Sequence, residues 1–331
     1  MTLSMPAEWA LHNRCWMAWP TEESRDFYKN LDQMRTQYAE VASAIAEFEP
    51  VRMLSNPDTL IDATRQCSTR VEVVASSLND AWMRDIGPTF VKDGKDNLGG
   101  VDWQFNCWGK PDRPHALDAQ VAKTVLESES ASCISAPIYL EGGAIHTDGE
   151  GTLLTTRNVV LNQNRNPGLS EVEAEQIFRR LLGIEKVIWL DNALECDDTD
   201  GHVDNLACFS KPGQVIVLTE SNQDDSNFWR LNKNLQTLKL SADASGNPIE
   251  VLALQQPARQ EYEGERLPSS YVNFYIANGG IIMPGFDDKM DQPALELIRS
   301  TFPDHEVIQV ASLEISKGGG NIHCITQQQP A

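Results

Sequence analysis

Two patterns of apolar positions alternate along this chain: short β-rich runs, and longer stretches in which apolar residues recur at helical spacing. The segment after the run at residues 152–156 is the clearest case, because Ser170 and Glu173 form a capping-box signature at the start of a helix. A β-rich run at residues 186–190 follows that helix. The same β-rich, helix, β order recurs, and it predicts five passes. Their closing strands are expected at residues 71–74, 134–140, 186–190, 249–254 and 307–310.

The spacing of these closing strands bears on the fold class. They lie roughly 50 to 65 residues apart, a period typical of propellers and other repeat architectures. An ordinary doubly wound α/β sheet also alternates strands with helices, so periodicity alone leaves both open. No linker rich in Pro, Gly or Ser divides the 331 residues, and we expect one domain over residues 1–331.

Four β-rich runs bear on where the units begin and end. The first pass is expected to run from a strand at residues 51–54, through a helix at about 58–70, to the strand at 71–74. Further runs are expected at residues 203–209 and 271–276. If a strand begins near residue 203, His202 and Asp204 project from the same face of it and can act together.

The charge of the chain narrows the class of partner. With 27 Lys and Arg against 48 Asp and Glu, the net charge is −21. That argues against nucleic acid and against anionic membrane surfaces as partners. It suits a small cationic substrate, although solubility alone would also explain it. The seven cysteines form no CxxC pair, no signal peptide is visible, and no apolar run approaches the ~18 residues of a membrane span. We therefore expect a cytoplasmic protein.

Chemically capable side chains follow the predicted closing strands. They are Asp85, Glu141, the pair His202 and Asp204, and Cys324. If the passes surround an axis, these groups converge on one pocket. Each also has an ordinary structural explanation: a turn carboxylate, a hydrogen-bonded pair or a buried thiol. The pair His202 and Asp204 could also be half of a metal site, since the same pattern recurs as His146-x-Asp148.

Taken together, a cysteine, a histidine and three carboxylates form an unusual set. Cys324 follows three glycines, Gly318, Gly319 and Gly320, which allow a sharp turn and the close approach of a ligand. A Cys–His pair is a nucleophile and its base. Several carboxylates suit a planar guanidinium, which they hold by charge-assisted hydrogen bonds. Signatures of dinucleotide, P-loop and serine-hydrolase sites are missing. The residues indicate attack on a guanidine carbon, with Trp82 as a candidate pocket wall.

The sequence also resembles the agmatine deiminases of the guanidino-group-modifying superfamily. The segments that carry the resemblance run in order from one end of the chain to the other. They are residues 5–9 (MPAEW), 16–20 (WMAWP), 82–88 (WMRDIGP), 141–146 (EGGAIH), 201–205 (GHVDN), 270–275 (SYVNFY), 318–326 (GGGNIHCIT) and 328–330 (QQP). The resemblance implies a five-fold pseudosymmetric α/β propeller, the pentein fold of ββαβ repeats.

The resemblance further implies a role for each site residue. Cys324 would be the nucleophile and His202 the general acid and base, oriented by Glu141. Asp85 and Asp204 would clamp the guanidinium. The enzyme would be a hydrolase of C–N bonds in linear amidines, converting agmatine through a covalent amidino-thioether to N-carbamoylputrescine, a precursor of putrescine. No cofactor or metal would be required, and a homodimer or larger assembly is plausible.

The substrate is less strongly indicated than the reaction. An agmatine pocket should offer an acid or a polar group to the terminal ammonium, and we assign Asp198 and the Trp82 wall to that end. Gly319 and Gly320 are expected to line the pocket beside the thiol. A deiminase of free or peptidyl arginine from the same superfamily stays open, as does a non-catalytic binder of guanidines or polyamines.

Overall fold

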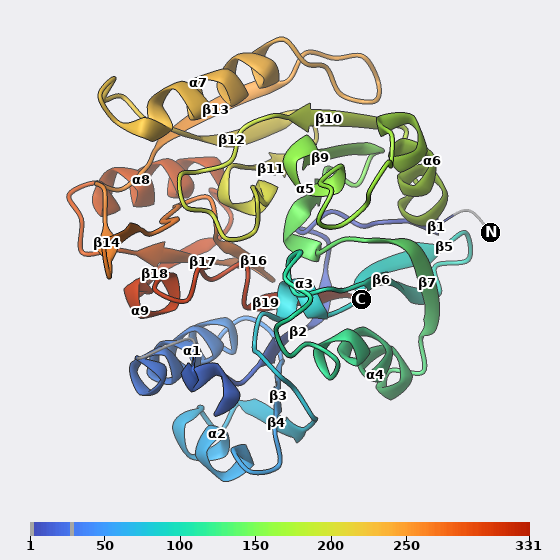
Figure 1. Ribbon diagram of the computed structural model, residues 1–331, viewed down its shortest axis with the longest axis vertical. Coiled ribbons are helices and arrows are strands. Elements are labelled where there is room, and N and C mark those ends of the chain that lie inside the picture. Colours follow the sequence, from blue (N-terminus) through green and yellow to red (C-terminus); the bar gives the residue numbers. More distant parts are fainter. Residues whose placement is uncertain (1–2, 27–29) are drawn as a thin grey trace.

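Five β-sheets surround a common centre in the computed structural model, which describes residues 3–26 and 30–331 (Figure 1). Each sheet contains one repeated unit: two antiparallel strands, a helix, and a strand parallel to the second of the two. Four units follow one another along the chain. They are β5 (Thr89–Asp93), β6 (Leu98–Gln104), α4 (Val121–Ser128) and β7 (Ser132–Tyr139); β8 (Ile145–Thr147), β9 (Thr152–Thr156), α6 (Glu171–Leu182) and β10 (Lys186–Leu190); β11 (Ala207–Lys211), β12 (Gln214–Thr219), α7 (Ser226–Lys239) and β13 (Glu250–Gln255); and β16 (Tyr275–Ala277), β17 (Gly280–Gly285), α8 (Asp291–Thr301) and β18 (Glu306–Ala311).

The fifth unit joins the two ends of the chain. Strand β19 (Thr326–Pro330) pairs antiparallel with β2 (His12–Ala18), and β2 pairs parallel with β3 (Val51–Ser55) after helix α1 (Leu31–Ile45). Helix α2 (Leu60–Gln66) and strand β4 (Val71–Ala75) extend this sheet outward. A short strand β1 (Leu3–Ser4) adds to β5 in the neighbouring unit. The ring of units is therefore closed by β19.

The α/β class and the count of five units agree with the prediction, but the first predicted pass is wrong. The strands at 51–55 and 71–75 are not the opening and closing strands of one unit. Instead β3 closes a unit that begins with β19 and β2. The pattern missed β2 because four successive residues, 15–18, are buried on both faces of the strand, so they show no clean alternation.

Two other predicted strands are shorter than expected. Residues 203–205 form a 3₁₀ turn, η4 (Val203–Asn205), and the strand β11 starts only at Ala207. His202 and Asp204 therefore do not share the face of a strand. In the run at 271–276, only the last two residues belong to β16. Apolar composition marked these segments as buried but did not determine their backbone.

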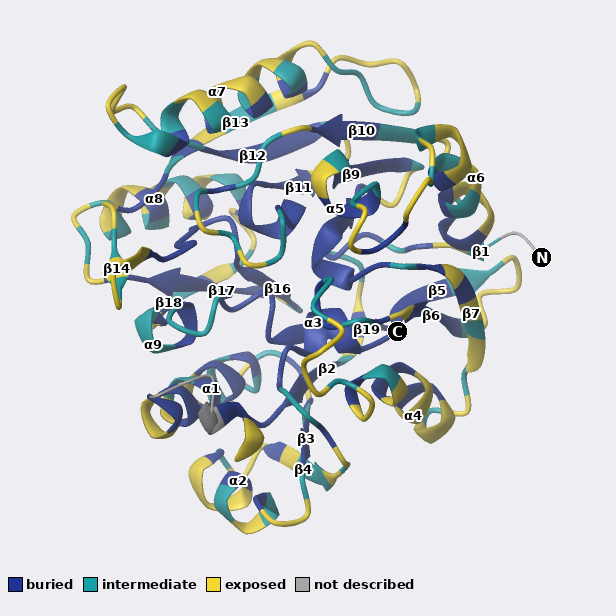
Figure 2. Ribbon diagram, in the orientation of Figure 1, coloured by how far each residue is buried: buried dark blue, intermediate teal, exposed yellow. Residues whose placement is uncertain are grey.

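The core lies between the sheets and the helices that cover them. In Figure 2 the strands are mostly buried, and the helices expose their outer faces. Helix α6 shows the pattern in detail: Ala174, Phe178 and Leu181 are buried. The Ser170 hydroxyl accepts from Glu173 N, which confirms the predicted capping box, and Gly183 ends the helix in the left-handed conformation. Within residues 3–26 and 30–331, no helix has the length and apolarity needed to cross a membrane.

Short turns occupy the inner ends of the units, where the ring leaves room for side chains. They are α3 (Met83–Ile86), η3 (Gly142–Ala144) and η4, and η3 contacts both of the others. Other short elements lie in the connecting segments. Within units they are η1 (Glu23–Asp26), η2 (Asp118–Gln120) and α5 (Arg157–Val160), and between units they are α9 (Leu313–Ser316) and the hairpin β14 (Glu261–Tyr262) and β15 (Glu265–Arg266). The three central turns carry or flank the predicted site residues.

Candidate active site

The Cys324 thiol lies just before β19, at the base of a pocket in the ring. The amide of Asn273 donates to its Sγ at 3.1 Å, and Sγ lies 3.4 Å from Asp204 Oδ2. The glycines before it behave as predicted. Gly319 has φ +100°, and a Cβ on Gly320 would lie 2.5 Å from the Trp82 ring and 3.1 Å from Sγ. Small residues therefore allow the loop to pass close over the thiol.

Asp85, on α3, is held by two donors. The backbone N–H of Gly143 donates to Oδ1 at 3.0 Å, and the indole N–H of Trp108 donates to Oδ2 at 2.8 Å. Trp108 had no signal in the sequence. It follows Cys107, and both have positive φ, +54° and +56°. Such a conformation is uncommon for residues other than glycine and often occurs at functional sites.

His202 lies between two carboxylates at the start of η4. Its Nε2 is 3.2 Å from Glu141 Oε2, and its Nδ1 is 3.7 Å from Asp85 Oδ1. Nδ1 is buried and makes no hydrogen bond within the described part of the chain. Glu141 also accepts from the buried Nε of Arg165, at 2.9 and 3.0 Å to its two oxygens. Arg165 therefore fixes Glu141, and Glu141 fixes the imidazole.

Asp204 connects the thiol to a second layer of buried charge. Its Oδ2 lies 2.9 Å from His323 Nδ1, and the other ring nitrogen of His323 lies 2.9 Å from Glu8 Oε1. Arg84 also pairs with Glu8, at 3.3 Å. Asp204 Oδ1 is buried and has no hydrogen-bond partner among the described residues. A buried carboxylate oxygen without a donor is costly, so it marks a place for a cationic ligand.

Gly143 lets three of these groups converge. A Cβ on it would lie 2.6 Å from His202 Nδ1, 2.8 Å from Asp204 Oδ2 and 3.0 Å from Asp85 Oδ1. No real side chain tolerates such distances. The structure thus brings Cys324, His202, Glu141, Asp85 and Asp204 together, as predicted.

The ionisation of the carboxylates follows from their partners. Burial alone would raise the pKa of Glu141, but the His202 hydrogen bond and the Arg165 charge hold it below its usual range. Burial likewise opposes ionisation of Asp204, yet its hydrogen bond to His323 and the nearby positive charges lower its pKa. Burial and the neighbouring carboxylates Asp204 and Glu141 raise the pKa of Asp85, against the opposing charge of His202.

The pKa values of the two groups expected to take part in the reaction, His202 and Cys324, are both raised. Burial would lower the pKa of His202, but Asp85, Glu141 and Asp204 raise it to about 9. Burial, with Asp204 and Asp85, raises the pKa of the Cys324 thiol well above its usual value. The ligand-free site therefore holds an imidazolium and a neutral thiol at neutral pH.

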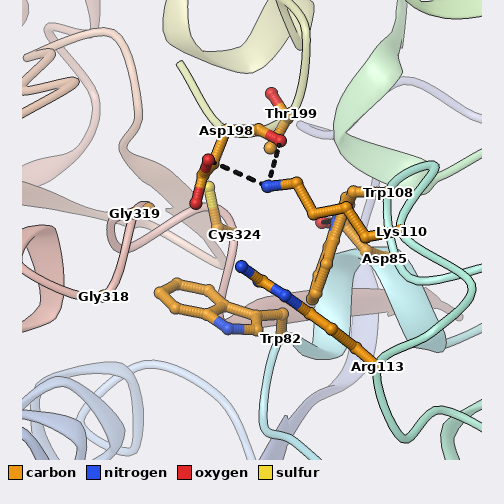
Figure 3. Close-up of a pocket in the computed structure, with 11 residues that line it drawn as sticks. Trp82, Asp85, Trp108, Lys110, Arg113, Asp198, Thr199, Gly318, Gly319 and Cys324 are labelled. Carbon is orange, nitrogen blue, oxygen red and sulfur yellow. Dashed lines mark hydrogen bonds and ion pairs between the residues drawn. The ribbon is translucent and has the colours of Figure 1, made fainter. Parts of the chain in front are cut away.

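The outer part of the pocket is lined by aromatic and charged side chains (Figure 3). Trp82 and Trp108 line it together with Lys110, Arg113 and Asp198. Asp198, predicted to receive a substrate ammonium, is already paired: Lys110 Nζ lies 2.8 Å from its Oδ1 and donates to its backbone carbonyl at 3.2 Å. No pattern in the sequence marked Lys110 or Arg113 as a residue of this mouth.

The repeated His-x-Asp pattern does not form two equivalent pairs. His146 Nε2 lies 3.4 Å from Glu8 Oε2, and its Nδ1 accepts from the Phe209 N–H. Asp148 instead accepts from the backbone of Glu150 and Thr152 in a turn. Across the described ranges, no three His, Cys, Asp or Glu side chains form a group that could hold a metal ion.

Comparison with known proteins gives consistent results. Residues 4–330 match the family model described as Porphyromonas-type peptidyl-arginine deiminase. An agmatine deiminase of Pseudomonas aeruginosa (strain LESB58) is 46% identical, and the alignment covers 99% of this chain and 95% of the relative. The agmatine deiminase structure of Enterococcus faecalis superposes with a TM-score of 0.95 at 34% identity, covering 99% and 96% of the two chains. A C. jejuni agmatine deiminase with substrate bound gives 0.91 at 26% identity, with coverage of 99% and 96%.

Proposed function

The chain belongs to the Porphyromonas-type peptidyl-arginine deiminase family, and we propose that it is an agmatine deiminase, which hydrolyses agmatine to N-carbamoylputrescine and ammonia. The observation that carries the chemistry is that the Cys324 thiol, beside Asp204, lies in the same site as a His202 nitrogen that makes no hydrogen bond and faces Asp85. This arrangement fits a planar cation that is attacked at its central carbon. The similarity to agmatine deiminases over nearly the whole chain supports agmatine as that cation.

Binding would place the guanidinium between Asp85 and Asp204. Asp204 Oδ1 gains the donor that it lacks, and Asp85, already held by Trp108 and Gly143, keeps one face toward the ligand. The added positive charge offsets the carboxylates that raise the pKa of the Cys324 thiol. The thiol proton leaves to solvent, and the thiolate attacks the guanidinium carbon.

Proton transfer would then fall to His202. With a pKa of about 9 it carries a proton at neutral pH, and the unpartnered Nδ1 is the atom that can deliver it. Protonation of one nitrogen of the tetrahedral adduct releases ammonia and leaves an amidino-thioether on Cys324. The neutral imidazole next takes a proton from water as the water attacks that carbon. Collapse of the second adduct breaks its C–S bond, and the proton of its hydroxyl group passes to the departing thiolate, which restores the thiol and gives the ureido product.

The distal end of agmatine would be bound at the pocket mouth. Its ammonium would pair with Asp198, and the Trp82 ring would cover the methylene chain and attract the nearby cation. One observation favours the second candidate function, a deiminase of arginine. Lys110 and Arg113 line the same mouth, and either cation could receive an α-carboxylate.

The cellular compartment and the oligomeric state of the protein are separate proposals. All seven cysteines are unpaired, which supports a reducing compartment, and we propose the cytoplasm. A homodimer or larger assembly stays a prediction from family resemblance, and light scattering on the purified protein would test it. The absence of nucleic-acid and membrane partners, expected from the net charge, is also a prediction.

Ammonia release from agmatine and from free arginine, by the wild type and by Cys324→Ala, tests the proposed function. We expect turnover of agmatine alone and its loss in the variant. Turnover of arginine but not agmatine would keep the chemistry and favour the second candidate. Activity that survives in Cys324→Ala would remove Cys324 as nucleophile. No release from either substrate would favour a binder.

A further inference from the structure

A cation of the protein occupies the position proposed for the substrate's ammonium. Lys110 reaches across the pocket mouth, and its Nζ contacts both the carboxylate and the backbone carbonyl of Asp198 (Figure 3). Lys110, Asp198 and the Cys324 thiol line one pocket. A lysine side chain ends in a primary ammonium on four methylenes, as agmatine does at the end opposite its guanidinium. The contact therefore copies the one that the substrate would make.

We propose that Lys110 is an internal competitor of the substrate, so that agmatine binds by exchanging its own ammonium for that of Lys110 on Asp198. This inference rests on the proposed function and deepens it. It makes Lys110 a residue that tunes specificity: it lowers the advantage that Asp198 gives to a guanidine with a distal ammonium, whereas a guanidine without that ammonium gains nothing from Asp198.

Hydrogen bonds hold the backbone that carries Lys110, so its side chain can move while its loop stays in place. Lys110 N donates to Cys107 O at 3.0 Å, and Gly109 N donates to Asn106 Oδ1 at 2.9 Å. The Asn106 amide in turn donates to Asn164 O at 2.9 Å. A rigid loop thus presents Lys110 at a constant place.

The ion pair between Lys110 and Asp198 is exposed enough to break readily. The Lys110 side chain is 32% exposed and that of Asp198 is 68% exposed. Exposed ion pairs contribute little because water screens both charges and two flexible side chains must be ordered. Released from Asp198, the Lys110 ammonium can enter water without a desolvation penalty. Competition should therefore weaken binding by a measurable but modest factor.

Calorimetry on the full chain carrying Cys324→Ala tests the exchange without turnover. The ligands are agmatine, arginine and n-butylguanidine, which has the guanidinium and four carbons but no ammonium. Adding Lys110→Met should lower the dissociation constant of agmatine about three- to fivefold, since a competing cation is removed. The dissociation constant of n-butylguanidine should change less than about twofold, because that ligand does not use Asp198. Lys110→Gln serves as a second neutral variant.

Two further variants isolate the pair. In the Asp198→Asn background, Lys110→Met should no longer lower the dissociation constant of agmatine, since the carboxylate that both cations share is gone. Lys123→Met is the matched control. This lysine is 56% exposed, pairs with Glu127 at 3.8 Å on α4, and its loss changes the net charge equally. It should leave all three dissociation constants unchanged.

The outcomes separate this inference from the proposed function. If agmatine binds and Lys110→Met weakens it, or changes agmatine and n-butylguanidine alike, the exchange is wrong and the function stands. If Lys110→Met instead weakens the binding of arginine, Lys110 binds the α-carboxylate of that ligand, and the inference is overturned. If agmatine binds to no variant while n-butylguanidine does, the assignment to agmatine fails together with the exchange.

Discussion

The inner and outer ends of the pocket are built in different ways. At the inner end, Asp85, Glu141, His202 and Asp204 are almost fully buried and are held by backbone turns and buried donors. At the outer end, Asp198 belongs to an exposed ion pair. The inner groups are oriented before any ligand arrives, which lowers the cost of reaching a transition state. The outer groups can exchange partners, which suits discrimination between substrates.

This difference predicts where substitutions should act. Changes at the inner end should lower the turnover number, because they disturb groups that act on the reacting carbon. Changes at the mouth should act mainly on the Michaelis constant and should depend on what the substrate carries at its far end.

Gly143→Ala should have the largest effect. Its methyl group would overlap His202 Nδ1 and two carboxylate oxygens, so kcat/KM for agmatine should fall about 10³-fold or more. The control is Gly246→Ala. Gly246 has a positive φ, +86°, which Gly143 does not, and nothing lies within 4 Å of its added Cβ. The control should lose stability and keep kcat/KM. Equal kinetics for the two variants would show that the space at Gly143 is unimportant.

Glu141→Gln should lower kcat about 10²-fold, because His202 loses the partner that orients it and stabilises its charge. The sign of the pH effect follows: Glu141 helps to raise the His202 pKa to about 9, so its loss lowers that pKa. The imidazolium then disappears at lower pH, and the alkaline limb of kcat should move down by about one unit. His202 can also be titrated by NMR.

The control for this variant is Glu49→Gln. Glu49 lies in an equally buried pair with His12, at 3.1 Å, outside the pocket. It should destabilise the fold and leave the alkaline limb of kcat in place. An unchanged His202 titration in Glu141→Gln would contradict the role given to Glu141.

Trp108→Phe should raise KM and lower kcat/KM about tenfold, because Asp85 loses one hydrogen bond in a buried place. Trp103→Phe removes the same indole donor from a buried tryptophan that binds Thr89 Oγ1 at 2.8 Å, outside the pocket. That control should change the melting temperature and not the kinetics. If both variants keep wild-type kinetics, the hydrogen bond from Trp108 to Asp85 does not contribute to function.

Asp198→Ala should have the smallest effect. We expect KM for agmatine to rise about fivefold with a smaller change in kcat, since an exposed carboxylate contributes little binding energy. Asp191 is the matched control, because it too is exposed and pairs with a cation, Arg157, at 2.8 Å. Asp191→Ala should leave KM unchanged. An unchanged KM in Asp198→Ala would remove Asp198 from the substrate site.

The sequence predicted the inner end well and the outer end poorly. Cys324, Glu141 and Asp85 lie in motifs whose residue types already suggest guanidine chemistry, and the structure brings them together. Lys110 and Arg113 lie in a polar loop without periodicity, so nothing marked them as pocket residues. Their position depends on the left-handed turn at residues 107–109, and only Gly109 in that turn favours such a backbone.

Supporting residues were missed for a different reason. Arg165 follows a helix in a stretch that looks like an ordinary surface loop, yet it is 2% exposed because it neutralises Glu141. Asn273 and His323 were within recognised motifs, but no local pattern shows what they contact 50 or more residues away. Periodicity reports which residues are buried. It does not report which distant polar groups share a buried network.

The strand that closes the ring also delivers the nucleophile. Cys324 stands two residues before β19, and β19 pairs with β2 across the chain: the side chains of Trp16 and Gln329, bonded at 2.8 Å, are 313 positions apart. Contacts between such distant positions are slow to form because a long loop must close first. During synthesis, this protein can acquire its thiol chemistry only after nearly every other element exists. Recovery of activity on refolding should therefore report ring closure itself.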